Sequence, residues 1–358
     1  MNPALSPRSL TELADAIRSA PRVLAIGAGT KPRLSAVEAT RVSTANLRGI
    51  LEYDPSEFTF TALAGTRVSE VAAALAERGQ HLPFDPLLVE SGSTLGGAVA
   101  SGLSGPGRFR FGGVRDFILS VRFVDGRGRL LRLGGKVVKN AAGFDLPKFF
   151  VGSLGRFGAL GEITFKVFPQ PASALTLGLR TGSFEVAARI LAKLARSRWE
   201  PEALDIPPGG HDIHVQLGGP RPALVALARE ILESYPGEVI DHAHDEWTDL
   251  REFRWAHPDG VLVKVPLSLD AVPALARAIG ALTDSKIHFS SGGNVAYLSV
   301  PHPETAEPVA AVLTRLGLTG LTLRGQAPLF LGAVKHPAIE TAVKMALDPD
   351  YRFPSLDD

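Results

Sequence analysis

The sequence predicts an α+β protein of two domains followed by a short C-terminal segment. At 358 residues the chain is too long for one small hydrophobic core. Its first half carries two glycine-rich stretches, each preceded by a predicted strand. Its second half alternates strands and helices in an order typical of an antiparallel sheet with helices on one face. The sequence PQPAS at 169–173 is the best linker between the halves, so we expect domains at 1–170 and 171–325 and a final segment at 326–358.

Composition excludes several classes of function. The 38 lysines and arginines nearly balance the 37 aspartates and glutamates, which argues against nucleic acid as a partner. Cysteine is absent, which excludes disulfides, thiolate zinc sites, iron–sulfur ligation and a cysteine nucleophile. No stretch approaches 18 uninterrupted apolar residues, so we expect no transmembrane segment and a cytoplasmic protein.

The first domain opens with a helix that begins after Ser9, because Ser9 and Glu12 have the spacing of a capping box. The strand RVLAI follows at 22–26. Residues 49–65 read as two strands around an Asp-Pro turn, and a helix at about 67–78 has Thr66 as its expected N-cap. Residues 117–135 predict a hairpin with an Asp-Gly turn.

The strand at 22–26 runs into the glycine turn of VLAIGAGTKPRL, residues 23–34. A Rossmann site needs G-x-G-x-x-G, and here Pro32 takes the place of the third glycine. A structural turn and another kind of phosphate-binding loop both stay open. The second stretch, 91–113, is too rich in glycine for a regular helix or a packed strand, so we expect a loop. Two such stretches can offer backbone N–H groups to one diphosphate, although glycine runs also form surface Ω-loops.

The second domain reads as two successive β-α-β-β-α-β units, at 175–243 and 261–324. No sequence repeat accompanies this similarity of element order. The last 30 residues hold one short helix, at about 338–347, and a polar tail.

Five short motifs follow one another between the predicted helix at 67–78 and the linker. They are STLGG at 93–97, SGLSGP at 101–106, VRD at 114–116, GGKVVKNAAGFD at 134–145 and GALGEIT at 158–164. Together they resemble the FAD-binding domain of the vanillyl-alcohol oxidase family, the PCMH fold, and within it the FAD-binding subunits of bacterial glycolate oxidases. The resemblance implies a PCMH-type domain of two α+β subdomains, a ferredoxin-like cap domain, and a C-terminal segment that returns toward the FAD domain.

The resemblance also assigns cofactor-binding residues. Those expected at the FAD pyrophosphate from the first loop are Gly27, Ala28, Gly29, Thr30 and Lys31. Those expected at the pyrophosphate and ribityl chain from the second stretch are Ser93, Thr94, Gly96 and Gly97, and those facing the flavin ring are Ala100, Ser101 and Gly102. Gly161 and Ile163 are expected beside the adenine, and Lys139 near the flavin. Asp116 is also assigned to the site, where it is expected to close the strand that follows the flavin-facing segment. A pairing of Lys139 with Asp145 has a surface ion pair as its alternative.

The function implied by the resemblance is that of an FAD-binding oxidoreductase subunit in a glycolate oxidase-like complex. Its substrate would be a small 2-hydroxy acid, and its partners a second flavin subunit and an iron–sulfur subunit. Association with the inner membrane through those partners is an open alternative to a purely cytoplasmic location. Two other readings stay open: a self-sufficient FAD-dependent 2-hydroxy acid dehydrogenase, and a structural subunit without catalytic function.

Histidine placement bears on how the cofactor is held. Relatives that attach FAD covalently carry a histidine beside one of the glycine stretches, and neither 26–31 nor 91–113 contains one, so we expect noncovalent FAD. The pairs His211/His214 and His242/His244 lack a third ligand at a suitable spacing, so we predict no metal site. His288 is a candidate for a group near the flavin, and Arg108 or Arg110 for contact with an anionic ligand. The catalytic residues stay unassigned.

Overall fold

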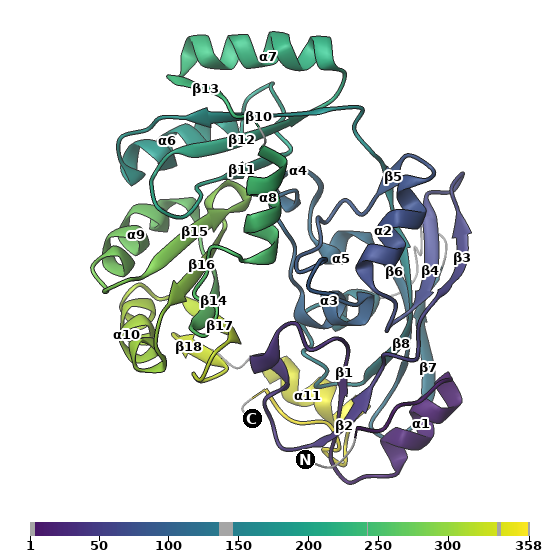
Figure 1. Cartoon of the computed structure of the whole chain (residues 1–358). Coiled ribbons are helices and arrows are strands. Elements are labelled where there is room, and N and C mark those ends of the chain that lie inside the picture. Colours follow the sequence, from purple (N-terminus) through teal and green to yellow (C-terminus); the bar gives the residue numbers. More distant parts are fainter. Residues whose placement is uncertain (1–3, 136–145, 242, 335–337, 357–358) are drawn as a thin grey trace. The chain divides into compact units, whose positions relative to one another are not determined.

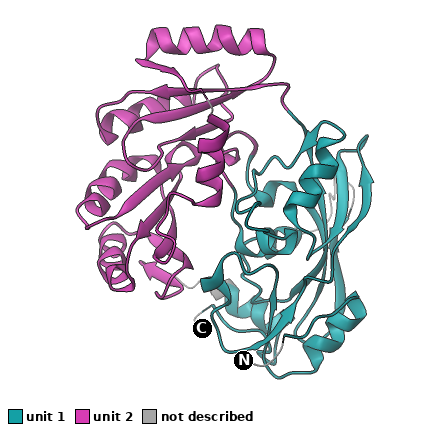
Figure 2. Cartoon of the chain, in the orientation of Figure 1, with its two compact units in different colours: residues 1–104, 112–170, 336–358 teal, residues 105–111, 171–335 magenta. Residues whose placement is uncertain are grey.

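The computed structural model describes residues 4–135, 146–241, 243–334 and 338–356 (Figure 1). The chain divides into two compact units (Figure 2). Unit 1 contains residues 1–104, 112–170 and 336–358, and unit 2 contains residues 105–111 and 171–335. Each unit is described below by itself.

The centre of unit 1 is a five-stranded antiparallel sheet. In spatial order its strands are β3 (Ile50–Asp54), β4 (Thr59–Leu63), β8 (Ala159–Lys166), β6 (Ile118–Val124) and β7 (Leu130–Gly134). Aromatic side chains fill its core: the rings of Phe60 and Phe165 stack with centroids 5.7 Å apart, and Phe84 lies 5.5 Å from Phe165. The predicted hairpin is confirmed as β6 and β7, with buried Asp125 accepting two backbone N–H bonds in the turn.

A smaller layer of unit 1 contains helix α1 (Leu10–Arg18) and two parallel strands, β1 (Val23–Ile26) and β2 (Thr40–Ser43). The hydroxyl of Ser9 caps α1 by accepting the Glu12 N–H at 3.1 Å, as predicted. The buried core of this layer unites Leu13, Val23, Val42 and, from the far end of the chain, Phe353. It therefore fixes strand β1, which leads into the first glycine loop.

The remaining elements of unit 1 are short. They are η1 (Pro32–Ser35), α2 (Val68–Ala76), β5 (Gln80–His81), α3 (Leu95–Ser101), α5 (Val114–Phe117), η2 (Leu146–Phe150), β9 (Phe168–Pro169) and α11 (Ala338–Leu347). The helix predicted at 338–347 is confirmed. Thr66 is not the N-cap of α2; Arg67 holds that position, while the Thr66 hydroxyl donates to the Leu63 carbonyl.

Helix α3 corrects the expectation of a loop throughout 91–113. Thr94 caps this helix by accepting the Gly97 N–H at 3.2 Å. A Cβ at Gly96 would lie 2.9 Å from the Cβ of Ala64, so glycine is what permits the helix to approach strand β4. Close packing and capping thus outweigh the poor helix propensity of glycine.

Unit 2 consists of two halves with the same strand order. The first half contains β10 (Ala174–Leu179), α6 (Phe184–Leu194), β11 (Ala203–Asp205), β12 (Ile213–Gly218), α7 (Arg221–Ser234) and β13 (Gly237–Val239). The second half contains β14 (Val261–Pro266), η3 (Leu269–Ala271), α9 (Val272–Gly280), β15 (Lys286–Ser290), η4 (Ser291–Gly293), β16 (Val295–Val300), η5 (Pro303–Thr305), α10 (Ala306–Arg315) and β17 (Thr319–Arg324). The sheets run β11-β12-β10-β13 and β15-β16-β14-β17. This is the β-α-β-β-α-β arrangement of a ferredoxin-like unit, so the α+β fold class is confirmed.

The two halves meet where β11 lies beside β15. Ile206 and Phe289 exchange both backbone hydrogen bonds, at 2.7 and 3.0 Å, which makes the two sheets continuous. Besides its short 3-10 helices, unit 2 contains elements that were not predicted: α4 (Arg108–Phe111), α8 (Ala243–Glu252) and β18 (Phe330–Gly332), which extends the second sheet beyond β17. In the part of the chain described, no helix has the length and apolar character needed to cross a bilayer.

Candidate functional site

The first glycine loop presents a row of backbone donors. Strand β1 ends at Ile26, and the amide N–H groups of residues 27–30 form no hydrogen bond within the described part of the chain. Gly29 has φ = +70°, a conformation that glycine adopts without strain. Unbonded N–H groups on successive residues form a concave anion-binding surface.

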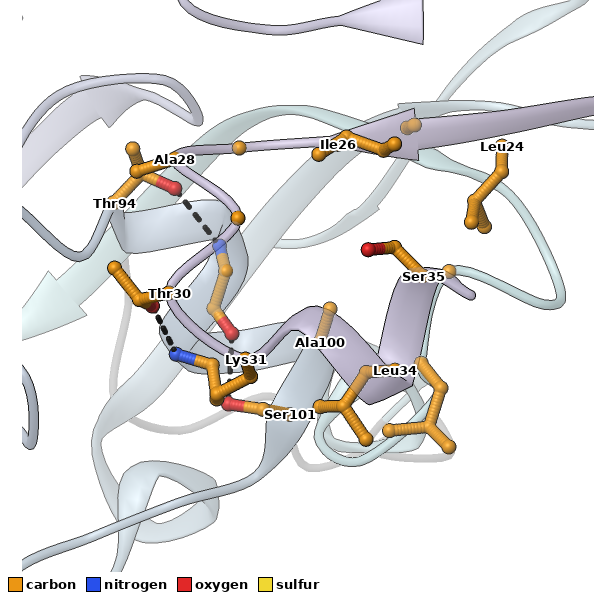
Figure 3. Close-up of a pocket in the computed structure, with 16 residues that line it drawn as sticks. Leu24, Ile26, Ala28, Thr30, Lys31, Leu34, Ser35, Thr94, Ala100 and Ser101 are labelled. Atoms are coloured by element: carbon orange, nitrogen blue, oxygen red, sulfur yellow. Dashed lines mark hydrogen bonds between the residues drawn. The ribbon is translucent and has the colours of Figure 1, made fainter. Parts of the chain in front are cut away.

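The second glycine stretch lies directly against this loop, as Figure 3 shows. A Cβ at Gly27 would be 2.3 Å from the Oγ1 of Thr94, which is too close for any side chain. Glycine at position 27 is therefore required for the contact. The two stretches that the sequence predicts at one diphosphate are brought together.

The second stretch contributes differently from the prediction. Its amides at residues 95, 96 and 97 are already bonded, to Thr66 O, Ala64 O and Thr94 Oγ1. The expectation that both stretches donate free amides thus fails for these three residues, because α3 uses them for its cap and its packing on β4. What this segment contributes to the cavity linings is Thr94, Gly96 and Gly97. The buried hydroxyl of Ser93 has no hydrogen-bond partner within the described residues, but Ser93 lines neither cavity.

Two adjoining cavities open along the first loop. The first, of about 80 Å³, is lined by Leu24, Ala25, Ile26, Gly27, Ala28, Gly29, Thr30, Lys31, Leu34, Ser35, Thr94, Gly97, Ala100, Ser101, Leu154 and Gly155. The second, of about 50 Å³, shares five of these residues and adds Thr44, Ala64, Gly96, Ser153, Gly158 and Leu160. Lys31 lines the first cavity, and it is the one ionisable side chain among the described residues that line either cavity. Its Nζ, largely buried, donates to Thr30 Oγ1 at 3.0 Å (Figure 3).

A second wall of the cavities comes from residues 153, 154, 155 and 158, which the resemblance did not assign. Leu154 and Gly155 have φ of 53° and 73°, a left-handed pair that turns the backbone toward the cavity. The sequence did indicate this wall, since GSLGRFG at 152–158 begins the same glycine-rich passage from which Gly161 and Ile163 were chosen. The residues that line the cavities lie a few positions before Gly161.

Six predicted residues lie outside the two cavity linings, and Ser93 is one of them. Gly102 ends α3 with φ = +61°, and Asp116 caps α5 by accepting the Gly113 N–H at 2.8 Å. Gly161 and Ile163 lie within β8, where Ile163 is fully buried. Lys139, together with Asp145, lies outside the described residues. The cofactor contacts expected of these residues stay predictions.

The first site has the chemistry of a diphosphate cradle. It combines four unbonded amides and one lysine, and no carboxylate is among the described residues that line it. Apolar and small side chains, among them Ala100 and Leu154, continue the wall beyond the donors. These residues fit the pyrophosphate and adjoining part of a dinucleotide such as FAD.

Unit 2 carries a row of polar side chains on the sheet face opposite helices α6, α7, α9 and α10, and helix α8 packs on this same face. Adjacent strands place His214 beside Asp205, and His288, Tyr297 and Lys264 in successive register. The neighbours of these residues, such as Leu204, Val215 and Phe289, belong to the core under the helices, so the row faces away from it. The carboxylate of fully buried Asp205 accepts from His288 Nε2 at 2.7 Å, Ser290 Oγ at 3.1 Å and Ser291 N at 3.0 Å.

Two members of this row have shifted pKa values. Burial, assisted by the positive charge of Arg108, lowers the pKa of the Lys264 ammonium group to about 8. Burial also lowers the pKa of His214, against the attraction of Glu246.

A cavity of about 320 Å³ lies elsewhere in unit 2, over β10, β12 and α8. Its lining includes Arg221, Arg251 and Asp241, together with Gln216 and Trp247. Because charges of both signs line it, this cavity does not select an anion as the first site does.

The histidines form no metal site within the described residues. His211 contacts Thr181 and Asp212, and His214 lies 3.4 Å from Glu246. His242 is outside the described residues. His288 is held by Asp205, and its other ring nitrogen is buried without a partner in the described chain.

Comparison with known proteins shows what this chain is similar to. Residues 3–134 match the family model described as an FAD binding domain. Over 231 residues the chain is 38% identical to glycolate oxidase subunit GlcE of Escherichia coli (strain K12), covering 63% of this chain and 62% of that subunit. It is 29% identical over 160 residues to glycolate oxidase subunit GlcD of Bacillus subtilis (strain 168), covering 45% and 34%. A D-lactate dehydrogenase of Anaerostipes hadrus is 28% identical, covering 46% and 34%. The chain thus spans less than two thirds of each relative.

Similarity of fold extends further than similarity of sequence. Two solved structures of alkyldihydroxyacetonephosphate synthase superpose with TM-scores of 0.70 and 0.71, at 17% sequence identity. They cover 97% and 99% of this chain, and 75% and 76% of theirs. The chain therefore has the fold of these two structures, and its residues 3–134 are similar to an FAD binding domain.

Proposed function

We propose that this chain is the FAD-binding subunit of a glycolate oxidase-like complex that oxidises a small 2-hydroxy acid. The observation that carries the proposal is the row of unbonded amides at 27–30 beside Thr94, in cavities whose lining contains no carboxylate. The similarity to a glycolate oxidase subunit supports the choice of reaction.

Binding of FAD is noncovalent in this proposal. The chain has no cysteine, and neither histidine nor tyrosine lines the two described cavities. The residues that would hold the diphosphate are the amides of 27–30 and the Nζ of Lys31. When bound, the flavin supplies the acceptor for the electrons of the substrate.

The substrate carboxylate is assigned in this proposal to Lys264 and Arg108 of unit 2. Arg108 is exposed, and its positive charge acts on the partly buried Lys264; two neighbouring cations favour an anionic ligand. Two other arginines of unit 2 are less suitable, because Arg254 pairs with Asp249 at 3.0 Å and Arg324 donates to the carbonyl of His257.

The proposed partners are a second flavin subunit and an iron–sulfur subunit. An iron–sulfur cluster needs cysteine ligands in almost every known form, and this chain has none, so the cluster would be held by another subunit. In this proposal the chain is cytoplasmic, and contact with the inner membrane would be made through its partners.

A second candidate is a self-sufficient FAD-dependent dehydrogenase. The similarity to D-lactate dehydrogenase and the cation pair at Lys264 favour it. A structural subunit that binds no flavin is the third.

One preparation separates these functions. The purified chain is examined by absorbance before and after denaturation, then mixed with glycolate or D-lactate. The proposal predicts a flavin spectrum, release of the flavin on denaturation, and little bleaching by substrate until the partner subunits are added. Rapid bleaching of the isolated chain would favour the self-sufficient enzyme. A chain that stays colourless after addition of FAD would overturn both enzymatic functions.

A further inference from the structure

The C-terminal segment of unit 1 converges on one buried lysine. Lys344, on α11, is 5% exposed, and its Nζ donates to the carbonyls of Arg156 (2.6 Å), Phe353 (2.7 Å) and Pro354 (3.1 Å). It also pairs with Asp348 at 2.8 Å. A charge buried this deeply is tolerated because a carboxylate and three carbonyls surround it.

Asp348 connects this lysine to the strand that carries the first glycine loop. Its fully buried carboxylate accepts the N–H groups of Arg352 and Phe353, each at 2.8 Å. The carbonyl of Arg352 in turn accepts the N–H of Val23 at 2.8 Å. Val23 begins β1, and β1 leads directly to the unbonded amides at 27–30.

Arg156 connects the same lysine to the second wall of the cavities, which residues 153, 154, 155 and 158 form. It follows Gly155, which lines both cavities, and its side chain is fully buried. Its Nη2 donates to the carbonyl of Leu34 at 3.3 Å, and Leu34 lines the first cavity from η1. Lys344 therefore holds the backbone beside one wall and, through Asp348, the strand behind the other.

We propose that Lys344 is a positioning residue for the cofactor, which fixes the spacing of the two walls of the diphosphate cradle. FAD affinity then depends on a C-terminal segment that, within the described residues, does not line the cavity. The physical reason is preorganisation: a cradle held at its bound spacing loses less entropy on binding. This inference rests on the proposed function, namely that the first cavity binds the diphosphate of FAD.

The test uses the full chain with Lys344→Met. Affinities for FAD and for ADP, which carries the diphosphate without the flavin, are measured by titration of the apoprotein. Both dissociation constants should rise about tenfold or more, the effect of losing about one charge-assisted hydrogen bond. Lys344→Arg, which keeps the charge, should recover part of the affinity. Asp348→Asn is a milder variant, should Lys344→Met fail to fold, and should give a smaller rise.

Ile231→Val is the control. It trims a fully buried side chain in the core of unit 2 and leaves the network around Lys344 unchanged. It should lower the melting temperature while leaving both dissociation constants within about twofold, because a loss of packing in unit 2 does not alter the cradle. Equal loss of affinity in Ile231→Val, or unchanged affinity in folded Lys344→Met and Asp348→Asn, would overturn the inference alone. A wild-type chain that binds neither FAD nor ADP would overturn the proposed function as well.

Discussion

At the scale of single residues, the site depends on a glycine that no other residue can replace. Gly27 lies so close to Thr94 that an added Cβ would be 2.3 Å from its hydroxyl oxygen. Either the loop or the N-cap of α3 would have to move, and both are parts of the proposed cradle. A single methyl group therefore tests the arrangement.

Gly27→Ala should weaken FAD binding by about tenfold or more, the equivalent of about one hydrogen bond to a charged group. The measurement is a flavin titration of the apoprotein with thermal unfolding alongside. Gly280→Ala is the control, because its Cβ would meet no atom within 4 Å and it lies in the last turn of α9. Undiminished affinity in a folded Gly27→Ala chain would contradict the placement.

Lys264 makes a prediction about pH. Its pKa in the folded chain is about 8, below that of an unfolded lysine, so between pH 8 and about 10.5 the unfolded chain binds the extra proton. The free energy of unfolding should therefore rise with pH in this window through this residue, by about 1–3 kcal/mol. Denaturant unfolding at pH 7.5 and 9.5 should show the rise in wild type relative to Lys264→Met. Exposed Lys193→Met is the control. If the free energy of unfolding of the wild type, relative to Lys264→Met, stays the same or falls between pH 7.5 and 9.5, the lowered pKa assigned to Lys264 is wrong.

The sequence predicts the first loop because closely spaced glycines indicate a backbone whose amides no side chain covers. It could not tell which amides are free. Gly96 and Gly97 read like further donors, but their N–H groups are used by Ala64 and Thr94. It also passed over Leu154, whose part in the wall depends on a left-handed backbone angle that leucine rarely adopts.

At the scale of elements, the row of polar residues in unit 2 stabilises the junction of its two halves. Asp205 on β11 bonds three groups at the end of β15, beside the Ile206–Phe289 backbone pair. Burial of a carboxylate is tolerated because all three partners donate to it. Loss of its charge should therefore loosen the sheet where the halves meet.

Asp205→Asn should lower the free energy of unfolding by roughly 2–4 kcal/mol, because an amide cannot accept all three bonds without turning its own donors toward one of them. Chemical denaturation measures this. Exposed Asp259→Asn should change stability by less than about 0.5 kcal/mol. Equal stability of the two variants would mean that Asp205 does not hold the junction.

Two elements show why propensity and pattern are insufficient. Helix α3 was missed because glycine disfavours helices, whereas its cap and its contact with Ala64 compensate. Helix α8 was missed because only Trp247 and Leu250 are buried on it, too few for a recognisable apolar stripe. A tertiary bond supports it, from the indole N–H of Trp247 to Thr176 Oγ1 at 2.9 Å.

At the scale of the whole molecule, element order was more informative than sequence repetition. The two halves of unit 2 share one strand order without sharing a sequence motif, because many apolar residues satisfy the same alternation. The assignment of residues 105–111 to unit 2 was beyond prediction. It depends on contacts such as the close approach of Phe109 to Gly292, which join positions far apart in the chain.

The last segment shows the same limit. Its helix was predicted, but the tail was described only as polar and its role was left open, whereas Phe353 and Asp348 are fully buried within unit 1. Burial of an aspartate becomes understandable only when its partners, Lys344 and two backbone amides, are known.

The central claim is that unbonded amides of residues 27–30 bind the diphosphate of FAD. Hydrogen exchange of the apoprotein, read by mass spectrometry over peptides that cover 23–35, tests it most directly. Added FAD and added ADP should both slow exchange at 27–30, and leave the turn at 125–129 unchanged. Flavin binding with unaltered exchange at 27–30 would contradict the account.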